Sequence, residues 1–415
     1  MMASTAPHGL EGYSAFQLRR AIERLREGLY DPLAVRLLTA HGDELEAKLR
    51  QDWLEVDAGA GAHLCVCGAY GQGKSHTLAY VQEFALQQGY AVSTINLDPR
   101  EAPLHRFRQV YRTLLQALTF PAEQEGAAAF MSFVNSWSAW ARVQPLACED
   151  RAGALAGLLP AAMPHVFKAI LVALAQATQE VPSRPQHTMP YTDMRPADSP
   201  WVLQCVLQGE FIPVARLRAA LKSRQVSFYR DASLALQSDE PFLQMLLALP
   251  QLFRRLGYRG WVVLFDEGEA ISQVRRPMRA RSYRILHRLL WPDSPPKGFY
   301  PVFAFTPDFF QRLQEEDYGL PEFDRDYVRA WRQLSLYQLH GLSLADWRDL
   351  CHPLIAVHSA AYGWHADRER LLPLLTAHLH TLPLQDPRST FKALVDELDQ
   401  VHQQEWFAQR SVIGA

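Results

Sequence analysis

Short apolar runs along the chain predict the strands of a sheet. Five such runs, rich in β-branched or aromatic residues, lie at 63–67, 91–97, 261–265, 301–305 and 334–339. Apolar runs of this length, bounded by turn residues, are typical of strands. The first is followed by a glycine-rich turn and an amphipathic stretch, which is the order strand, loop, helix, so the run at 91–97 is expected to be the next parallel strand.

Helical spacing dominates both ends of the chain. Ser14 precedes apolar residues at helical intervals, and Asp31 followed by Pro32 combines a capping residue with a proline in the first helical position. From about residue 340 onward only helical patterns occur. We expect an N-terminal helical segment at 1–60 and a C-terminal helical lid domain at 341–415.

A long insertion separates the second strand from the third, because a simple crossover needs far fewer residues than lie between 97 and 261. Its alanine- and leucine-rich parts, 125–180 and 214–256, have helical composition, and 182–200 carries five prolines and is expected to be an exposed loop. The predicted core therefore spans 61–340, with a helical insertion at about 121–250.

Composition favours a soluble protein of the reducing cytoplasm. The chain has 415 residues, 48% hydrophobic content and a net charge of −2, so it can build a core by burial alone and carries no overall basic field. Five cysteines without a C-x-x-C pair do not resemble a disulfide framework or a zinc site. No apolar run approaches the length that spans a bilayer, and the N-terminus lacks the pattern of a signal peptide.

Residues 68–75 match the phosphate-binding pattern G-x-x-x-x-G-K-[ST] in full, between a predicted strand and a predicted helix. Glycines let backbone N–H groups turn toward phosphates, the lysine reaches the β and γ oxygens, and the last hydroxyl ligates Mg²⁺. The residues expected to contact ATP are Gly68, Tyr70, Gly71, Gln72, Gly73, Lys74, Ser75 and His76. For His76, which follows the pattern, a plain role in the first helical turn is the simpler interpretation.

Asp266 and Glu267 end the apolar run that begins at Trp261. In phosphate-loop enzymes an acid at this point holds the magnesium shell, and a second acid beside it orients and polarises the attacking water. We assign Asp266, with Ser75, to Mg²⁺ and Glu267 to the water. The second acid favours hydrolysis over phosphate transfer to a small-molecule acceptor, which is a third interpretation.

Two further residues are candidates for reading the γ-phosphate. Thr306 is the first polar residue after the fourth strand and is suited to the role called sensor 1, with a turn or cap residue as the alternative. Arg388 precedes the last predicted helix, from which an arginine can reach the nucleotide, the role called sensor 2. The alternative for Arg388 is an exposed arginine at a helix start.

Six arginines without an acidic residue between them lie in one stretch: Arg275, Arg276, Arg279, Arg281, Arg284 and Arg288. Guanidinium groups fit phosphate oxygens bidentately, so this stretch is a candidate to contact a DNA backbone or the γ-phosphate of a neighbouring subunit. A solvated helix face is the alternative.

The chain resembles the ATP-binding proteins of bacterial BREX phage-defence systems, of the BrxC and BrxD type, with closer likeness to BrxD. The resemblance rests on GAYGQGKSHTL at 68–78, the block 94–121, VVLFDEGEAI at 262–271, FAFTPDFF at 303–310 and PRSTFKALVDELD at 387–399. The family more often has alanine where Gly268 stands.

This resemblance implies an AAA+-like P-loop ATPase that acts with helicase or other defence components against invading DNA, and we expect an oligomer. ATP hydrolysis would then drive assembly or remodelling of a DNA-associated complex. A nucleotide-controlled binding module, which holds ATP to recruit a helicase partner and turns over negligibly, uses the same residues. The sequence leaves both interpretations open.

Overall fold

The computed structural model describes residues 10, 12–29, 31–121, 126–146, 150–176, 199–226, 233–316, 334, 336–384 and 386–413. Nearly all of the proline-rich loop predicted at 182–200 lies outside these residues, as does Cys148.

A mostly parallel six-stranded sheet forms the centre of the molecule, with the strand order β3-β2-β4-β5-β1-β6. Its strands are β1 (Leu64–Cys67), β2 (Ala91–Asn96), β3 (Leu118–Thr119), β4 (Trp261–Asp266), β5 (Phe299–Phe305) and β6 (Leu336–Gln338). The five predicted strands are thereby confirmed. The sequence analysis missed β3, which has only two residues and pairs antiparallel with β2 at the sheet edge.

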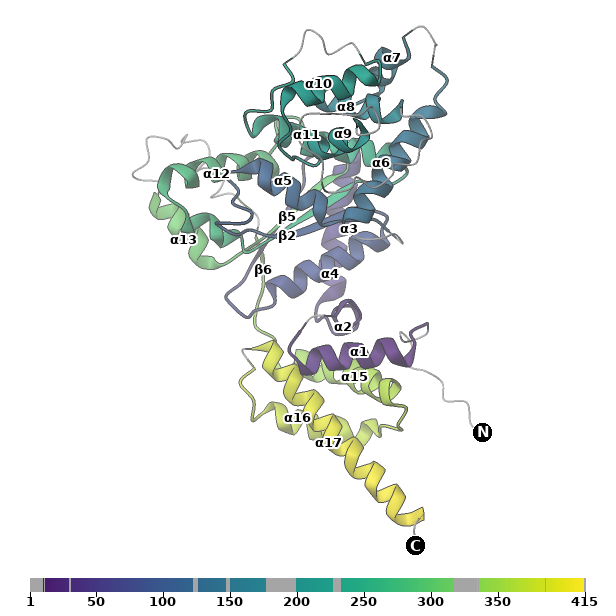
Figure 1. Cartoon of the computed structure of the whole chain (residues 1–415). Coiled ribbons are helices and arrows are strands. Elements are labelled where there is room, and N and C mark those ends of the chain that lie inside the picture. Colours follow the sequence, from purple (N-terminus) through teal and green to yellow (C-terminus); the bar gives the residue numbers. More distant parts are fainter. Residues whose placement is uncertain are drawn as a thin grey trace.

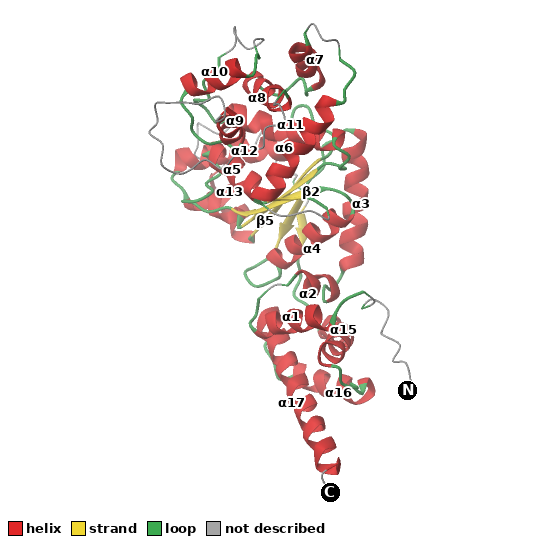
Figure 2. Ribbon diagram, turned by 45° about the vertical axis from the view of Figure 1, so that its right-hand side comes forward, coloured by secondary structure: helices red, strands yellow, loops and turns green. Residues whose placement is uncertain are grey.

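Both faces of the sheet are buried, and alternate residues of each strand belong to different cores. Val262 and Leu264 of β4 pack toward α3 (Gly42–Ala58) and α4 (Lys74–Gln87), whereas Val263 and Phe265 pack on the opposite side. Figure 2 shows α3 on one side of the strands and α5 (Phe107–Gln116) and α13 (Pro307–Glu316) on the other. The helices that share these two cores include α3, α4, α5, α11 (Glu240–Arg255), the 3-10 helix η2 (Gly268–Gln273), α12 (Arg276–Leu290) and α13.

The insertion is helical where the structure describes it and lies at one end of the molecule (Figure 1). Its helices are α6 (Ala127–Arg142), α7 (Arg151–Leu158), α8 (His165–Ala175), α9 (Ser199–Leu207) and α10 (Val214–Ser223). They bury their apolar faces in the same core as α5, α11 and one face of the sheet. The insertion is therefore packed onto the sheet and its covering helices rather than separated from them.

Helices from both ends of the chain form a second body, here called the terminal unit. It consists of α1 (Ala15–Arg26), α2 (Pro32–Leu37), α15 (Leu344–Tyr362), α16 (Arg368–Leu379) and α17 (Pro387–Ile413). Figure 1 shows these helices at the opposite end from the insertion. The predicted caps form: Ser14 makes a capping box with Gln17, and the Asp31 side chain accepts from the Leu33 amide.

A polar cluster joins α1 to the C-terminal helices. The Arg26 guanidinium donates to Asp399 Oδ2 at 2.7 Å, and fully buried His358 lies 3.0 Å from Asp399 Oδ1. Trp364 Nε1 donates to His358 Nδ1 at 3.0 Å, so the proton of the neutral ring lies on Nε2 and faces Asp399. The division of the chain at 1–60, 61–340 and 341–415 stays a prediction, and the packing adds that its first part contributes α1 and α2 to the terminal unit and α3 to the sheet.

Candidate functional site

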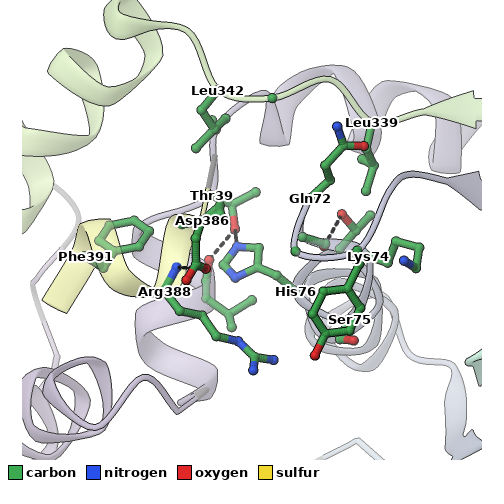
Figure 3. A pocket seen from close by; sticks show the side chains of 18 of the residues that line it. Thr39, Gln72, Lys74, Ser75, His76, Leu339, Leu342, Asp386, Arg388 and Phe391 are labelled. Atoms are coloured by element: carbon green, nitrogen blue, oxygen red, sulfur yellow. Dashed lines mark hydrogen bonds between the residues drawn. The ribbon is translucent and has the colours of Figure 1, made fainter. Parts of the chain in front are cut away.

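A cavity of about 1120 Å³ lies between the terminal unit and the edge of the sheet at which the parallel strands end. Residues of the 68–75 loop, the end of β4, α2 and the start of α17 all line it. Figure 3 shows part of this lining from close by, with Lys74 and Ser75 of the loop and Arg388 of α17. Clefts outside the carboxyl ends of parallel strands are the usual ligand sites of such sheets. The volume exceeds that of most small-molecule sites, so a nucleotide has room.

The 68–75 loop is held open by backbone conformations that glycine permits. Gly71 and Gly73 have φ of 84° and 90°, in the left-handed region that other residues rarely adopt. The Gly68 amide donates to Phe305 O of the neighbouring strand at 3.1 Å, and the Ala69 amide donates to Gln72 Oε1 at 2.6 Å. Tyr70, at the tip, is 94% exposed, so any contact with phosphate at this position would come from its backbone.

Lys74 is the first residue of α4 and its side chain is buried beneath the loop. Its Nζ donates to the carbonyl oxygens of Gly68 at 3.1 Å and Ala69 at 3.3 Å. Among the described residues no side chain caps the N-terminus of α4, so the amides of its first turn remain available to an anion. Loop, ammonium group and helix end therefore converge as a phosphate site requires.

The acid pair lies at the same edge of the sheet, one strand removed from the loop. Asp266 ends β4, which is separated from β1 by β5 alone, so the two strand ends are about 10 Å apart at ordinary strand spacing. Glu267 has a φ of 55°, unusual for a residue with a Cβ, and its amide donates to Asp266 Oδ1 at 2.8 Å. Such backbone strain is concentrated at functional sites.

Close packing against β5 explains why glycine, rather than alanine, stands at position 268. A Cβ at this position would lie 2.5 Å from the Phe305 ring and 2.7 Å from Ala304 O, so an alanine cannot be placed without a backbone shift. The glycine thus lets the turn after Glu267 pack directly against β5.

The pKa of Glu267 is raised above its ordinary value. Burial is the largest cause, followed by the negative charges of Asp266, Glu269 and Asp98, while the Lys74 ammonium opposes the shift. The carboxylates around the cavity therefore present a site that favours a cation, and Glu267 is a stronger base than an isolated glutamate.

A magnesium ion fits the residues present. Ser75 and Asp266 line the same cavity and offer the oxygen donors that Mg²⁺ prefers. No group of three or more histidine, cysteine, aspartate or glutamate side chains among the described residues is arranged to hold a metal by itself. Mg²⁺ commonly takes one or two protein ligands and completes its shell with phosphate and water, so the donor set agrees with a metal that enters with the nucleotide.

The remaining predicted site residues divide between the cavity and its surroundings. Arg388 lines the cavity from the first turn of α17, and its amide donates to Asp386 Oδ1 at 3.1 Å. Thr306 directly follows β5 at the same sheet edge but is not among the residues that line the cavity.

His76 lines the cavity, and its Nε2 lies 2.7 Å from Thr39 Oγ1 on the α2 side. Burial lowers the pKa of His76 to about 4, so the ring is neutral near pH 7.

Several residues that line the cavity were missed from sequence, above all Thr39, Glu269 and Phe391. Phe391 belongs to the terminal unit and Thr39 lies just after its helix α2. No local sequence pattern indicates that these residues reach the loop. Glu269 carried a signal, because it is the third acid within four residues at the end of an apolar strand.

The arginine stretch runs from the N-cap of α12 along that helix, and some of its arginines form ion pairs with neighbouring helices. Arg279 pairs with Glu316 of α13 and donates to Val274 O at 2.6 Å, and Arg288 donates to Glu240 Oε1 of α11 at 2.9 Å. Arg275, Arg276, Arg281 and Arg284 are exposed. None of the six arginines lines the site cavity.

The mostly parallel sheet, the glycine loop at a helix start and the acid pair across from it together describe a mixed α/β protein with a nucleotide-type site. The chain belongs to the family described as BREX system ATP-binding protein BrxC/D, whose model matches residues 15–173 and 234–415. The family covers BrxC and BrxD together, so the closer likeness to BrxD stays a prediction. Comparison with curated proteins and with solved structures gave no match. Among the described residues no helix is long and apolar enough to cross a membrane.

Proposed function

We propose that this protein is a Mg²⁺-dependent ATPase with a P-loop, AAA+-like core that acts in a BREX-type defence system. Membership of the ATP-binding family supports ATP as the ligand. The observation that carries the proposal of hydrolysis is that the 68–75 loop and the carboxylates of Asp266 and Glu267 line one cavity.

The roles follow from position and charge. The amides of the loop and of the first turn of α4 would bind the phosphates, and the Lys74 ammonium would leave the carbonyls of Gly68 and Ala69 for the β and γ oxygens. Ser75 and Asp266 would hold Mg²⁺, which neutralises charge on the phosphates when bound. Glu267 would accept the proton of the attacking water, in keeping with its raised pKa.

Arg388 would bring positive charge to the γ-phosphate from the terminal unit, and closure of the cavity would depend on the nucleotide. Thr306 would act only through residues nearer the phosphate or after a movement. The output we propose is assembly or remodelling of a DNA-associated complex with a helicase or other defence partner, in an oligomeric and cytoplasmic protein.

Steady-state ATP hydrolysis by wild type and Lys74→Ala, with and without DNA, tests the proposal. We expect measurable turnover by wild type and its loss, with weaker ATP binding, in Lys74→Ala. Lys222→Ala, which removes an exposed lysine from α10 in the insertion, is the control and should match wild type. Intact ATP binding by wild type without turnover in any condition would favour the nucleotide-controlled binding module instead.

A further inference from the structure

The terminal unit and the sheet are joined by two short linkers that both line the site cavity. The first, 38–41, leads from α2 of the terminal unit into α3, which packs on the sheet. The second, 339–343, leads from β6 back to α15. Residues of both linkers line the cavity, so a ligand that fills it lies directly at the connection between the two bodies.

A hydrogen bond ties the first linker to the residue after Ser75. The Thr39 hydroxyl donates to Val35 O at 2.5 Å, one turn back in α2, which leaves its oxygen to accept at 2.7 Å from Nε2–H of His76. Figure 3 shows this contact between Thr39 and His76. α2 also packs against α4, so the bond lies within an interface between the terminal unit and the helix that begins at the loop.

The end of the first linker is strained and reaches the terminal unit a second time. His41 has a φ of 56°, a conformation that surrounding contacts must hold in a residue with a Cβ. Its Nε2 lies 3.2 Å from Asp346 Oδ1 in the first turn of α15. The linker 38–41 therefore contacts both an N-terminal helix, α2, and a C-terminal helix, α15, of the terminal unit.

We propose that the hydrogen bond between Thr39 and His76, here called the joint, couples nucleotide binding at the 68–75 loop to movement of the terminal unit. Thr39 acts in it as a positioning residue. The inference rests on the proposed nucleotide site. When phosphate binds at Lys74 and Ser75, the first turn of α4 adjusts, His76 moves with it, and the hydrogen bond carries α2 and the rest of the terminal unit along.

The test measures movement separately from binding. Noncanonical amino acids that carry spin labels are introduced at two exposed positions, Glu55 on α3 and Gln403 on α17. The distance between the two labels reports the separation of the two bodies. Wild type should show a shifted distance distribution on addition of a non-hydrolysable ATP analogue with Mg²⁺. Thr39→Val keeps the shape but removes the hydroxyl, so it should bind the analogue within about threefold of wild type and lose most of the shift.

Two controls separate the joint from a general effect on folding. Thr376→Val removes a hydroxyl that likewise donates to the carbonyl four residues back, at 2.7 Å, but on α16, and it should retain the full shift. Thr39→Ser restores the hydroxyl and should restore the shift. A full shift in Thr39→Val, or bound analogue without any shift in wild type, overturns the inference. Absence of analogue binding by wild type would instead remove the proposed nucleotide site and the inference with it.

Discussion

At the scale of single residues, Glu267 combines three properties that suit a general base. It follows the strand that ends in Asp266, it has a left-handed backbone conformation, and neighbouring carboxylates together with burial raise its pKa. A glutamate whose pKa is raised is a stronger base than one that is well solvated. The Lys74 ammonium limits this shift and keeps the carboxylate available.

We expect Glu267→Gln to lower kcat by at least about a hundredfold while the protein still binds ATP, because the amide cannot accept the proton. The wild-type rate should fall as the pH drops through the raised pKa of Glu267, since the protonated acid is inactive as a base. That acid limb should be missing from the residual activity of the variant. Hydrolysis by the glutamine variant at the wild-type rate would show that another group activates the water.

Gly268 makes a second prediction at this scale. Gly268→Ala should destabilise the protein by about 1–3 kcal/mol, because its Cβ would overlap the Phe305 ring and Ala304 O. Urea unfolding measures the loss. Gly157→Ala on α7 is the control, since a Cβ there meets no atom of the described residues within 4 Å, and it should cost nothing. Equal stability of Gly268→Ala and wild type would contradict the packing described here.

At the scale of elements, the arginines of α12 fall into two groups in the folded protein, those in ion pairs with neighbouring helices and those that are exposed. Arg279 forms an ion pair with Glu316 of α13, and Arg288 forms one with Glu240 of α11, so these pairs link α12 to both helices. Arg281 and Arg284 are exposed one turn apart and are the better candidates for a DNA backbone. The acidic partners lie far away in sequence, which is why the run of arginines could not reveal this division.

If DNA binds at α12, Arg281→Glu combined with Arg284→Glu should weaken binding by at least about tenfold and reduce its dependence on salt. Fluorescence anisotropy with labelled duplex DNA over a series of salt concentrations measures both. The control is Arg218→Glu, an exposed arginine on α10. Unchanged affinity and salt slope in the double variant would remove α12 as the contact.

Local patterns predicted elements well and their assembly poorly. The caps at Ser14 and Asp31 and the five apolar runs depend on neighbouring residues, so sequence was sufficient for them. β3 was missed because two residues carry no periodicity. α9 begins at Ser199, inside the last two residues of the predicted proline-rich loop, and residues 174–233, which contain α9 and α10, fall outside the family match.

At the scale of the whole molecule, the cavity exists because two bodies meet. The loop and the acid pair were predictable, since each follows a strand of a parallel sheet and such strands end at one edge. The opposite wall was only partly predictable: Arg388 was a candidate, whereas Thr39 and Phe391 depend on contacts between distant segments. Packing of α1 and α2 with α15–α17 produces that wall.

In the terminal unit, Asp399 forms hydrogen bonds with both Arg26 of α1 and His358 of α15. Burial alone would raise its pKa, but hydrogen bonds from His358 and Arg26 outweigh burial and lower the pKa below the ordinary 3.8. Its contribution to stability is thus present above the ordinary pKa and is lost as the pH falls through the lowered value. We expect Asp399→Asn to cost about 1–3 kcal/mol near pH 7 and less in acid.

Chemical unfolding at pH 7 and at pH 3, followed by circular dichroism, measures this difference. Asp396→Asn, one turn earlier on α17, is the matched control and should leave stability nearly unchanged. A cost for Asp399→Asn that is equal at both pH values would assign the effect to side-chain shape rather than to charge.

The terminal unit draws on both ends of the sequence, which has a consequence for biosynthesis. α1 and α2 leave the ribosome before the sheet and the insertion, yet the helices against which they pack are translated after both. A nascent chain can therefore complete its sheet while the phosphate loop is still uncovered on one side. The cavity gains the wall formed by the terminal unit only after α17 has been synthesised, so chains terminated before α17 should lack that wall.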